Sequence, residues 1–498
     1  MELENKWSRA AGVLMPISSL PGEYGIGTLG KEAYAFADFA KEAGFSYWQV
    51  LPVGPTSYGD SPYQAFSAFA GNPYFIDLEA LVEEGLLDIG DVESCFWGEK
   101  ENQVDYGAIY MSRFAVLRKA FERSRYYLEE EYEKFCKENA YWLTDYALFM
   151  AVKKAFENRS WQDWDKDIRC REEKAVQAYL EKYEEDVEFY KFCQYKFDTQ
   201  WKKLRKYVNS LGIEIIGDIP LYVSMDSVDV WVHSKLFELD IDRKEVNIAG
   251  VPPDLFSATG QRWGNPLYRW DVMEKDDFDW WRKRMFFSAK KYDVIRVDHF
   301  IGVVNYYSIP ATCPTAVDGV WKKGPGAKLT KVIAEATKGA KIIAEDLGVL
   351  TQPVIDLMEE SGYPGMKVLE FGLDCAPDNQ FLPHNYTTCN TVAYIGTHDN
   401  ETLVGCLAGK SDYEIKRIME YFGVDNRDKL IPAMIRSVYA CIANTAILQM
   451  QDLIGLGNDA RMNFPSTMGC NWAWRMTKDQ YKKIDTAYYK RLAEMYRR

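Results

Sequence analysis

Asp293-Val-Ile-Arg-Val-Asp298, Lys341-Ile-Ile-Ala-Glu345 and Thr391-Val-Ala-Tyr-Ile-Gly-Thr-His-Asp399 share one pattern. In each, a short apolar run of β-forming residues ends at a carboxylate. An ionisable side chain directly after a buried strand is costly unless it is hydrogen-bonded or functional. Three such ends, in order along the chain and about fifty residues apart, predict one cluster at the mouth of a parallel barrel.

Further runs of the same kind extend this pattern along the chain. Helical patterns separate most of them, as in Lys31–Glu42, whose small and apolar residues recur at helical spacing. Alternation of strands and helices implies parallel pairing. The predicted fold class is therefore α/β, a (β/α)8 TIM barrel that occupies 1–498 as a single catalytic domain without a C-terminal β-sandwich domain. The eight strands expected are 11–17, 47–53, 213–219, 293–298, 341–346, 366–371, 391–397 and 452–457.

Three intervals are too long to be plain connections between strands. Residues 54–200 predict a mostly helical subdomain inserted between the second and third strands, and 401–450 predict a helical insertion between the seventh and eighth. Residues 220–292 predict an insertion that carries a Gly/Pro/aromatic loop at 250–268. Long loops that stay compact are typically lids or binding loops, so we expect this loop at the active site.

Composition narrows the class of protein. The chain has 498 residues, 47% hydrophobic and 27% charged, with a net charge of −14 that disfavours nucleic acid or an anionic membrane as partner and suits a neutral substrate. The 15% of aromatic residues mostly fill the core, but a few rings suffice to stack on sugars. Ten scattered cysteines, the lack of a signal peptide and the lack of a long apolar run predict a cytoplasmic protein.

Two carboxylates at a barrel mouth are the groups that cleave a glycosidic bond with retention of configuration. Asp298 is the candidate nucleophile, because Arg296 lies two residues earlier on the same strand face and favours its ionised form. Glu345 is the candidate acid/base, although the adjacent Asp346 satisfies the spacing equally well. Asp399 would then stabilise the positive charge that develops on the sugar.

Other interpretations of these residues were weighed against this one. An Arg-x-Asp pair on a strand is often a structural ion pair. His299 and His398 stand beside candidate carboxylates, yet the chain holds only four His, too few for the metal sites of hydrolases on this barrel. A Ser or Cys nucleophile is disfavoured because no Gly-x-Ser-x-Gly elbow occurs. We therefore expect neither a metal nor a cofactor.

Motifs spread over nearly the whole chain resemble those of the amylomaltases, the 4-α-glucanotransferases or disproportionating enzymes of glycoside hydrolase family 77 in the α-amylase clan. The motifs are Ser18-Ser-Leu-Pro-Gly-Glu-Tyr-Gly-Ile-Gly27, Tyr47-Trp-Gln-Val-Leu-Pro-Val-Gly-Pro55, Gly59-Asp-Ser-Pro-Tyr-Gln64, Ile216-Gly-Asp-Ile-Pro220, the 250–268 loop, Arg296-Val-Asp-His-Phe300, Ala344-Glu-Asp-Leu-Gly348, Gly396-Thr-His-Asp-Asn400, Ala460-Arg-Met-Asn-Phe-Pro465 and Gly469-Cys-Asn-Trp-Ala-Trp474.

The resemblance implies a role for each matching position. Asp298 would be the nucleophile, Glu345 the acid/base and Asp399 the transition-state stabiliser. The remaining positions implied to bind substrate are Asp218, Arg296 and His398 beside the carboxylates, Asp374, Asn463 and Pro465 near the donor sugar, Tyr63, Ser61, Phe256, Gln261 and Trp263 on the acceptor side or lid, and Tyr58 and Tyr106 for glucan held away from the cleavage point.

Two departures from the family pattern leave the fine substrate preference open. Ile301 stands where the family commonly has Arg, and Ser466 stands where it commonly has Gly.

The expected activity is transfer of α-1,4-glucan segments to the 4-OH of glucose or a maltooligosaccharide. Maltooligosaccharides and starch- or glycogen-type glucans are the expected partners. An α-1,4-glucan hydrolase of the same clan would share the donor-side chemistry, and a silent glucan-binding protein would keep the aromatics while losing a carboxylate. All three carboxylates are present. Chain-length preference, linear versus cyclic products and oligomeric state are left open.

Overall fold

Eight parallel strands form the central sheet of the molecule. The computed structural model describes residues 7–253, 257–467, 469 and 471–498. Neighbouring strands follow the order β10-β11-β12-β1-β2-β3-β6-β9. The first and last of these also meet, because the Ala344 N–H donates to the Pro364 carbonyl at 3.0 Å, so the sheet is a nearly closed barrel. Its strands are β1 (Ala10–Leu14), β2 (Tyr47–Gln49), β3 (Glu214–Ile219), β6 (Val294–Val297), β9 (Lys341–Ala344), β10 (Gly365–Val368), β11 (Thr391–Tyr394) and β12 (Thr445–Gln449).

The predicted (β/α)8 fold is confirmed, but the eighth predicted strand was wrong. Residues 452–457 do not form a strand; α18 (Met450–Ile454) occupies their start and ends at Gly455, whose φ is 80°. The true strand, β12, lies earlier, inside the interval 401–450, and pairs with both β1 and β11. The short apolar run at 452–457 ends in glycine, as a strand often does, but its first residues are helical and the Asp452 carboxylate accepts from the Leu403 N–H at 2.7 Å.

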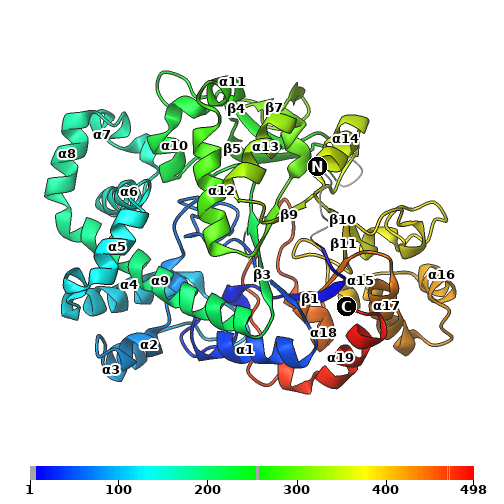
Figure 1. Ribbon diagram of the computed structural model, residues 1–498. Helices are drawn as coiled ribbons and strands as arrows, with labels where there is room; N and C mark the ends of the chain where they lie inside the picture. Colours follow the sequence, from blue (N-terminus) through cyan, green and yellow to red (C-terminus); the bar gives the residue numbers. More distant parts are fainter. Residues whose placement is uncertain (1–6, 254–256, 468, 470) are drawn as a thin grey trace.

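Helices cover the outside of the barrel (Figure 1). The expected helix at Lys31–Glu42 is α1, which buries Ala33, Phe36, Ala37 and Ala40. The other helices that lie between barrel strands in the chain, or follow the last one, are α12 (Asp279–Lys291), α13 (Ala327–Ala336), α14 (Gln352–Ser361), α15 (Leu403–Ala408), α16 (Asp412–Phe422), α17 (Leu430–Ala440) and α19 (Thr486–Met495).

A group of helices lies between β2 and β3 in sequence and gathers on one side of the barrel, at the left of Figure 1. The longest, α9, leads directly into β3 and buries aromatic residues along much of its length. These helices are α2 (Leu78–Glu83), α3 (Ile89–Glu93), α4 (Tyr106–Arg123), α5 (Glu130–Glu138), α6 (Leu143–Ala155), α7 (Lys166–Arg169), α8 (Glu173–Lys182) and α9 (Glu184–Ser210).

A second sheet, antiparallel and four-stranded, lies toward the top of the molecule in Figure 1. Its order is β5-β4-β7-β8, with β4 Asn247–Val251, β5 Gln261–Pro266, β7 Asn305–Pro310 and β8 Val320–Lys323. The short helices α10 (Val228–Val232) and α11 (Trp270–Met273) flank β4 and β5 in the chain. The expected loop 250–268 is thus the hairpin of β4 and β5, which the sequence did not predict.

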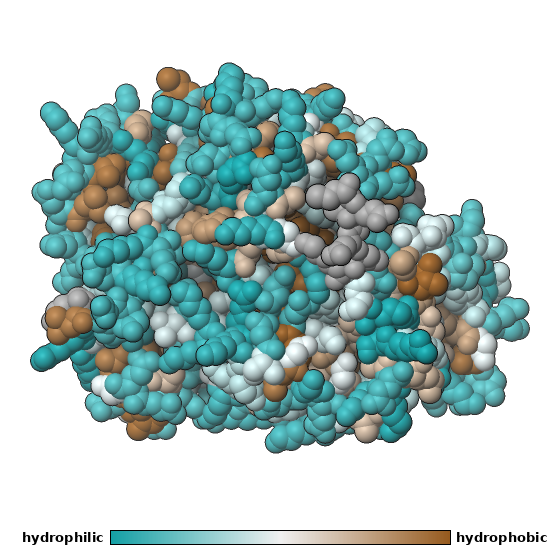
Figure 2. All heavy atoms as spheres, in the orientation of Figure 1, coloured by the Kyte–Doolittle hydropathy of each residue, from teal (hydrophilic) through white to brown (hydrophobic). Residues whose placement is uncertain are grey.

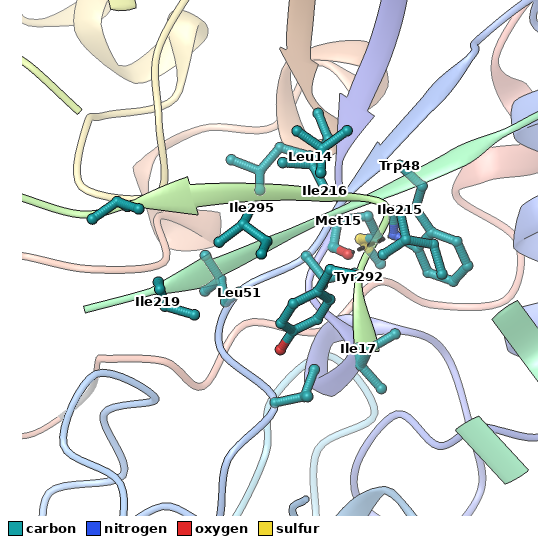
Figure 3. Close-up of a cluster of buried hydrophobic side chains, with 14 of the residues drawn as sticks. Leu14, Met15, Ile17, Trp48, Leu51, Ile215, Ile216, Ile219, Tyr292 and Ile295 are labelled. Atoms are coloured by element: carbon teal, nitrogen blue, oxygen red, sulfur yellow. Dashed lines mark hydrogen bonds between the residues drawn. The ribbon is translucent and has the colours of Figure 1, made fainter. Parts of the chain in front are cut away.

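The barrel core is built from strand residues that are buried on both faces, as parallel sheets require. Figure 3 shows Leu14, Trp48, Ile215 and Ile295 within this cluster. The Trp48 indole N–H donates to the Met15 carbonyl at 2.8 Å, so its polar atom is satisfied. A Cβ on Gly217 would lie 2.1 Å from the Tyr292 ring, which explains the glycine in the middle of β3.

The outer surface is polar where Figure 2 views it, with hydrophobic residues scattered among hydrophilic ones. Within the described part of the chain, no helix combines the length and the apolar character that crossing a membrane requires.

Candidate active site

Arg296 in β6 joins the candidate nucleophile Asp298 to a second carboxylate, Asp218. Arg296 Nη1 donates to Asp298 Oδ1 at 3.0 Å and to Asp218 Oδ2 at 2.6 Å. The period-two alternation of the strand brings Arg296 and Asp298 to the same face, and the β3–β6 register sets Asp218 beside Arg296. Burial disfavours the guanidinium charge, but the two carboxylates outweigh it and raise the pKa of Arg296 well above its usual range. Asp298 therefore has a permanent cation beside it.

Glu345 follows β9 and is more deeply buried than Asp298. Its carboxyl oxygens accept backbone hydrogen bonds from the His299 N–H at 2.7 Å and the Leu347 N–H at 2.6 Å, and the residue is 7% exposed. Burial, followed by the negative charge of Asp298, raises the pKa of Glu345 to about 8. A carboxyl of this kind carries a proton at neutral pH.

Asp346 points elsewhere, which resolves the ambiguity left by its neighbour. Its carboxylate accepts from the Met366 N–H of β10 at 2.7 Å, and a Cβ on Gly365 would lie 2.4 Å from its Oδ2. Asp346 thus packs between strands, while Glu345 faces Asp298.

Asp399 is the most exposed of the three carboxylates, with 45% of its side chain accessible. Asn463 Nδ2 donates to Asp399 Oδ1 at 2.6 Å, and Arg461 Nη2 donates to the Asp399 carbonyl at 2.8 Å. The buried His398 lies with its Nε2 3.4 Å from Asp399 Oδ2. One carboxylate oxygen is therefore fixed, and the group remains open to a ligand.

Tyr63 contacts both Asp218 in β3 and His398 after β11. Its hydroxyl donates to Asp218 Oδ2 at 2.9 Å, and its ring stacks on the His398 imidazole with centroids 5.1 Å apart and an interplanar angle of 16°. Trp472 packs against both rings. The segment around Tyr63 thereby connects the ends of β3, β6 and β11.

The hairpin of β4 and β5 supplies part of the expected acceptor side. The Trp263 indole N–H donates to Gln261 Oε1 at 3.1 Å, and its ring meets the His299 ring edge-on with centroids 4.7 Å apart. The Ser61 hydroxyl oxygen accepts from the Tyr63 N–H at 3.3 Å. Phe256 lies outside the described residues.

Four predicted residues share no hydrogen bond, ion pair or ring contact with the three carboxylates in the described part of the chain. Tyr58 is 91% exposed. Asp374 is exposed and closes a local turn by accepting from the Ala376 N–H at 3.1 Å. Pro465 is exposed, and Tyr106 reaches the site only through Trp472, whose carbonyl accepts from its hydroxyl at 3.0 Å.

The sequence analysis missed several residues of the site. Trp472, Arg461 and Leu347 lie inside the matching motifs, but only the fold brings the Trp472 ring to His398, the Arg461 guanidinium to the Asp399 carbonyl and the Leu347 N–H to Glu345. The backbone N–H of His299, rather than its ring, reaches Glu345. Among the described residues, no group of three or more His, Cys, Asp or Glu is arranged to hold a metal ion.

One departure from the family pattern has a structural counterpart. Ser466 adopts a φ of 66°, a left-handed conformation that glycine takes without cost. The glycine common at this position in the family fits the same backbone. Ile301, the other departure, is buried, and its Cδ1 would lie 3.3 Å from a Cβ on Gly348.

Comparison with known proteins places the chain in a family. A sequence profile described as 4-alpha-glucanotransferase matches residues 15–480. The 4-alpha-glucanotransferase of Clostridium butyricum is 47% identical over 93% of this chain and 95% of its own length, and that of Thermus thermophilus is 44% identical over 98% of both. The amylomaltase from Streptococcus agalactiae, solved in complex with acarbose, has a TM-score of 0.95 at 43% identity and covers 98% of this chain and 99% of its own. The chain belongs to the 4-alpha-glucanotransferases of glycoside hydrolase family 77.

Proposed function

We propose that this protein is a 4-α-glucanotransferase, which moves an α-1,4-glucan segment from a donor to the 4-OH of glucose or a maltooligosaccharide. The observation that carries the proposal is the contrast between two neighbouring carboxyl groups. Asp298 touches a buried guanidinium, whereas Glu345 is desolvated with a pKa of about 8. Two carboxyl groups whose environments separate their protonation states are what a retaining mechanism uses.

In the first half of the reaction, the Asp298 carboxylate attacks the anomeric carbon. Glu345 gives its proton to the glycosidic oxygen as that bond breaks, so the leaving chain departs as an alcohol and a covalent glycosyl-enzyme forms. Asp399, with one free oxygen, accepts hydrogen bonds from sugar hydroxyls and stabilises the oxocarbenium-like charge. Arg296 holds Asp298 in place for the attack.

In the second half, Glu345 is ionised and acts as a base. It takes the proton from the 4-OH of an acceptor sugar, whose oxygen attacks the anomeric carbon and releases Asp298. The two backbone N–H groups on Glu345 stabilise its ionised form during this interval. The enzyme returns to its starting protonation state, and the configuration at the anomeric carbon is retained.

Transfer rather than hydrolysis requires that an acceptor sugar displaces water at the glycosyl-enzyme. Trp263 offers an aromatic face beside His299, next to the nucleophile, and Phe256 belongs to the same hairpin sequence. Aromatic faces bind the apolar sides of sugars and shed water. The names of the family relatives agree with transfer, and the hydrolase alternative is not favoured.

The proposed substrates are maltooligosaccharides and starch- or glycogen-type glucans, with glucose as an acceptor. Asp218, His398, Asn463, Tyr63, Ser61 and Gln261 are proposed to contact sugar directly or to hold the residues that do. Asp374 and Pro465 are proposed to lie near the donor sugar, and Tyr58 and Tyr106 to hold glucan away from the cleavage point. The cytoplasmic location stays a prediction.

The product pattern from maltotriose tests the proposal. A transferase converts maltotriose to glucose plus a ladder of longer maltooligosaccharides, which chromatography resolves. Asp298→Asn should abolish the ladder, while Asp346→Asn, a matched change at a carboxyl that packs between strands, should retain it. Glucose and maltose without longer products would favour the hydrolase instead.

A further inference from the structure

His299 has a backbone conformation that calls for a cause. Its φ of 50° and ψ of 44° lie in the left-handed region, which costs a non-glycine residue on the order of 1 kcal/mol or more. In this conformation its N–H donates to Glu345 Oε2 at 2.7 Å, while its carbonyl accepts from the Gly302 N–H at 2.9 Å and closes the next turn. The strained backbone therefore aims a donor at Glu345.

The imidazole of His299 packs against two aromatic rings. The Trp263 ring meets it at 88° with centroids 4.7 Å apart, and the Tyr222 ring lies at 6.3 Å. A Cβ on Gly302 would lie 2.9 Å from His299 Cδ2, so the ring is closely packed on that side as well. Burial lowers the pKa of His299 to about 4, and the ring is neutral at working pH.

Trp263 is not a barrel residue. It belongs to β5, which pairs with β4 in the second sheet, and its carbonyl accepts from Gln64 Nε2 at 3.4 Å. A displacement of Trp263 would therefore act directly on the His299 ring. The backbone N–H of the same residue, His299, donates to Glu345. His299 therefore contacts both Trp263 and Glu345.

We propose that His299 is a positioning residue that couples the hairpin of β4 and β5 to the carboxyl group of Glu345, with Trp263 holding the imidazole and the backbone N–H holding Oε2. The inference rests on the proposed role of Glu345 as acid/base. It means that an acceptor sugar seated against Trp263 also fixes the group that must deprotonate it. Acceptor binding and base catalysis are then linked through one residue.

The sign of the effect follows from the hydrogen bond. A backbone N–H on a carboxylate stabilises its ionised form and lowers its pKa, so weakening this bond raises the pKa of Glu345. Burial is the largest influence on the pKa of Glu345 and raises it; of the charged groups, Asp298 raises it and Arg296 lowers it. Both come from the end of β6 and are unchanged in the variants below.

The test is a double-mutant cycle in which the pH dependence of kcat/KM is measured for each variant. The variants are Trp263→Ala, His299→Asn and the double variant; asparagine tolerates the left-handed backbone but lacks the ring that Trp263 contacts. The alkaline limb of kcat/KM on maltotriose should move up by about 0.5 to 1 pH unit in Trp263→Ala. Replacing Trp263 in the His299→Asn background should move it no further.

Each outcome bears on the coupling. An unmoved limb in Trp263→Ala, or an equal shift from Trp263→Ala in both backgrounds, overturns it, since neither result needs the imidazole. Melting temperatures and circular dichroism establish that each variant is folded. Failure of the proposed function is distinguishable, because wild-type protein would then form no ladder from maltotriose at any pH.

Discussion

The protonation of Glu345 makes a quantitative prediction about pH. With a pKa of about 8, the carboxyl is protonated in about nine of ten molecules at pH 7, against well under one in a hundred for an unperturbed Glu. Because bond cleavage needs that proton, kcat/KM on maltotriose should stay high through neutrality and fall above pH about 8. Initial rates of glucose release from pH 5 to 10 measure the limb.

The Glu345→Gln variant tests this role because it removes the ionisable carboxyl group. The variant should lose roughly 100- to 10,000-fold on maltotriose, the contribution of a general acid, and its residual rate should show no alkaline limb. An α-maltosyl fluoride donor, whose leaving group needs no proton, should form the glycosyl-enzyme at a rate much closer to wild type. An equal loss on both donors, or a limb that persists in Glu345→Gln, would refute the assignment.

The free energy of unfolding should also depend on pH through Glu345, and it should fall as the pH rises. A carboxyl whose pKa is raised on folding contributes stability that is present below its unfolded pKa of about 4.5 and is lost as pH rises through about 8. Glu345→Gln removes that loss, so the variant should melt at a higher temperature than wild type at pH 8. The gap should narrow toward pH 5, and calorimetry at the two values checks it.

The other predictions concern the nucleophile, metals, the lid and a strained turn. Asp298→Asn should lose at least about three orders of magnitude in kcat, since a covalent step is lost, and near-wild-type turnover would contradict its role. Activity should survive exhaustive chelation, because the proposed mechanism needs only carboxylates; inactivation by a chelator, reversed by zinc or calcium, would count against it. Phe256→Ala should lower the ratio of transfer to hydrolysis by roughly five-fold, equivalent to ~1 kcal/mol for one aromatic–sugar contact, and an unchanged ratio would make the loop structural only. Ser466→Gly should raise the free energy of unfolding by about 0.5–1 kcal/mol, because glycine relieves the φ of 66°; a destabilised variant in urea denaturation would show that the serine side chain matters more.

Most of the barrel could be predicted because parallel strands are buried on both faces and appear as short apolar runs. Seven of the eight expected segments contain or overlap a barrel strand. The failure at 452–457 has a specific cause. The Thr-Ala-Ile-Leu-Gln segment of β12 directly follows a helical region, and no carboxylate comes immediately after it as one does after β6 and β9, whereas the next apolar run ends in glycine.

The second sheet could not be predicted from local pattern. Its β4 and β7 pair between Asn247 and Pro310, across an interval that contains a complete barrel strand. β5 carries a glycine and a proline, and β8 is a short, mostly exposed edge. Such strands have little apolar periodicity of their own. They form because the partner strands supply the hydrogen bonds.

In the active site, too, some residues could be found from the local sequence, whereas others depend on contacts between distant segments. The three carboxylates could be found because each follows a short apolar run that contains a strand, but the choice between Glu345 and Asp346 depends on which strand face points into the barrel mouth. The sequence does not show which of the two side chains lies on that face. The hydrogen bonds do, because Glu345 accepts from the His299 N–H whereas Asp346 accepts from the Met366 N–H. The stacking of Tyr63 on His398 depends in the same way on where a loop after β2 crosses the barrel. Residues that perform chemistry are therefore visible in this sequence, while the residues that orient them become visible only once the barrel is closed.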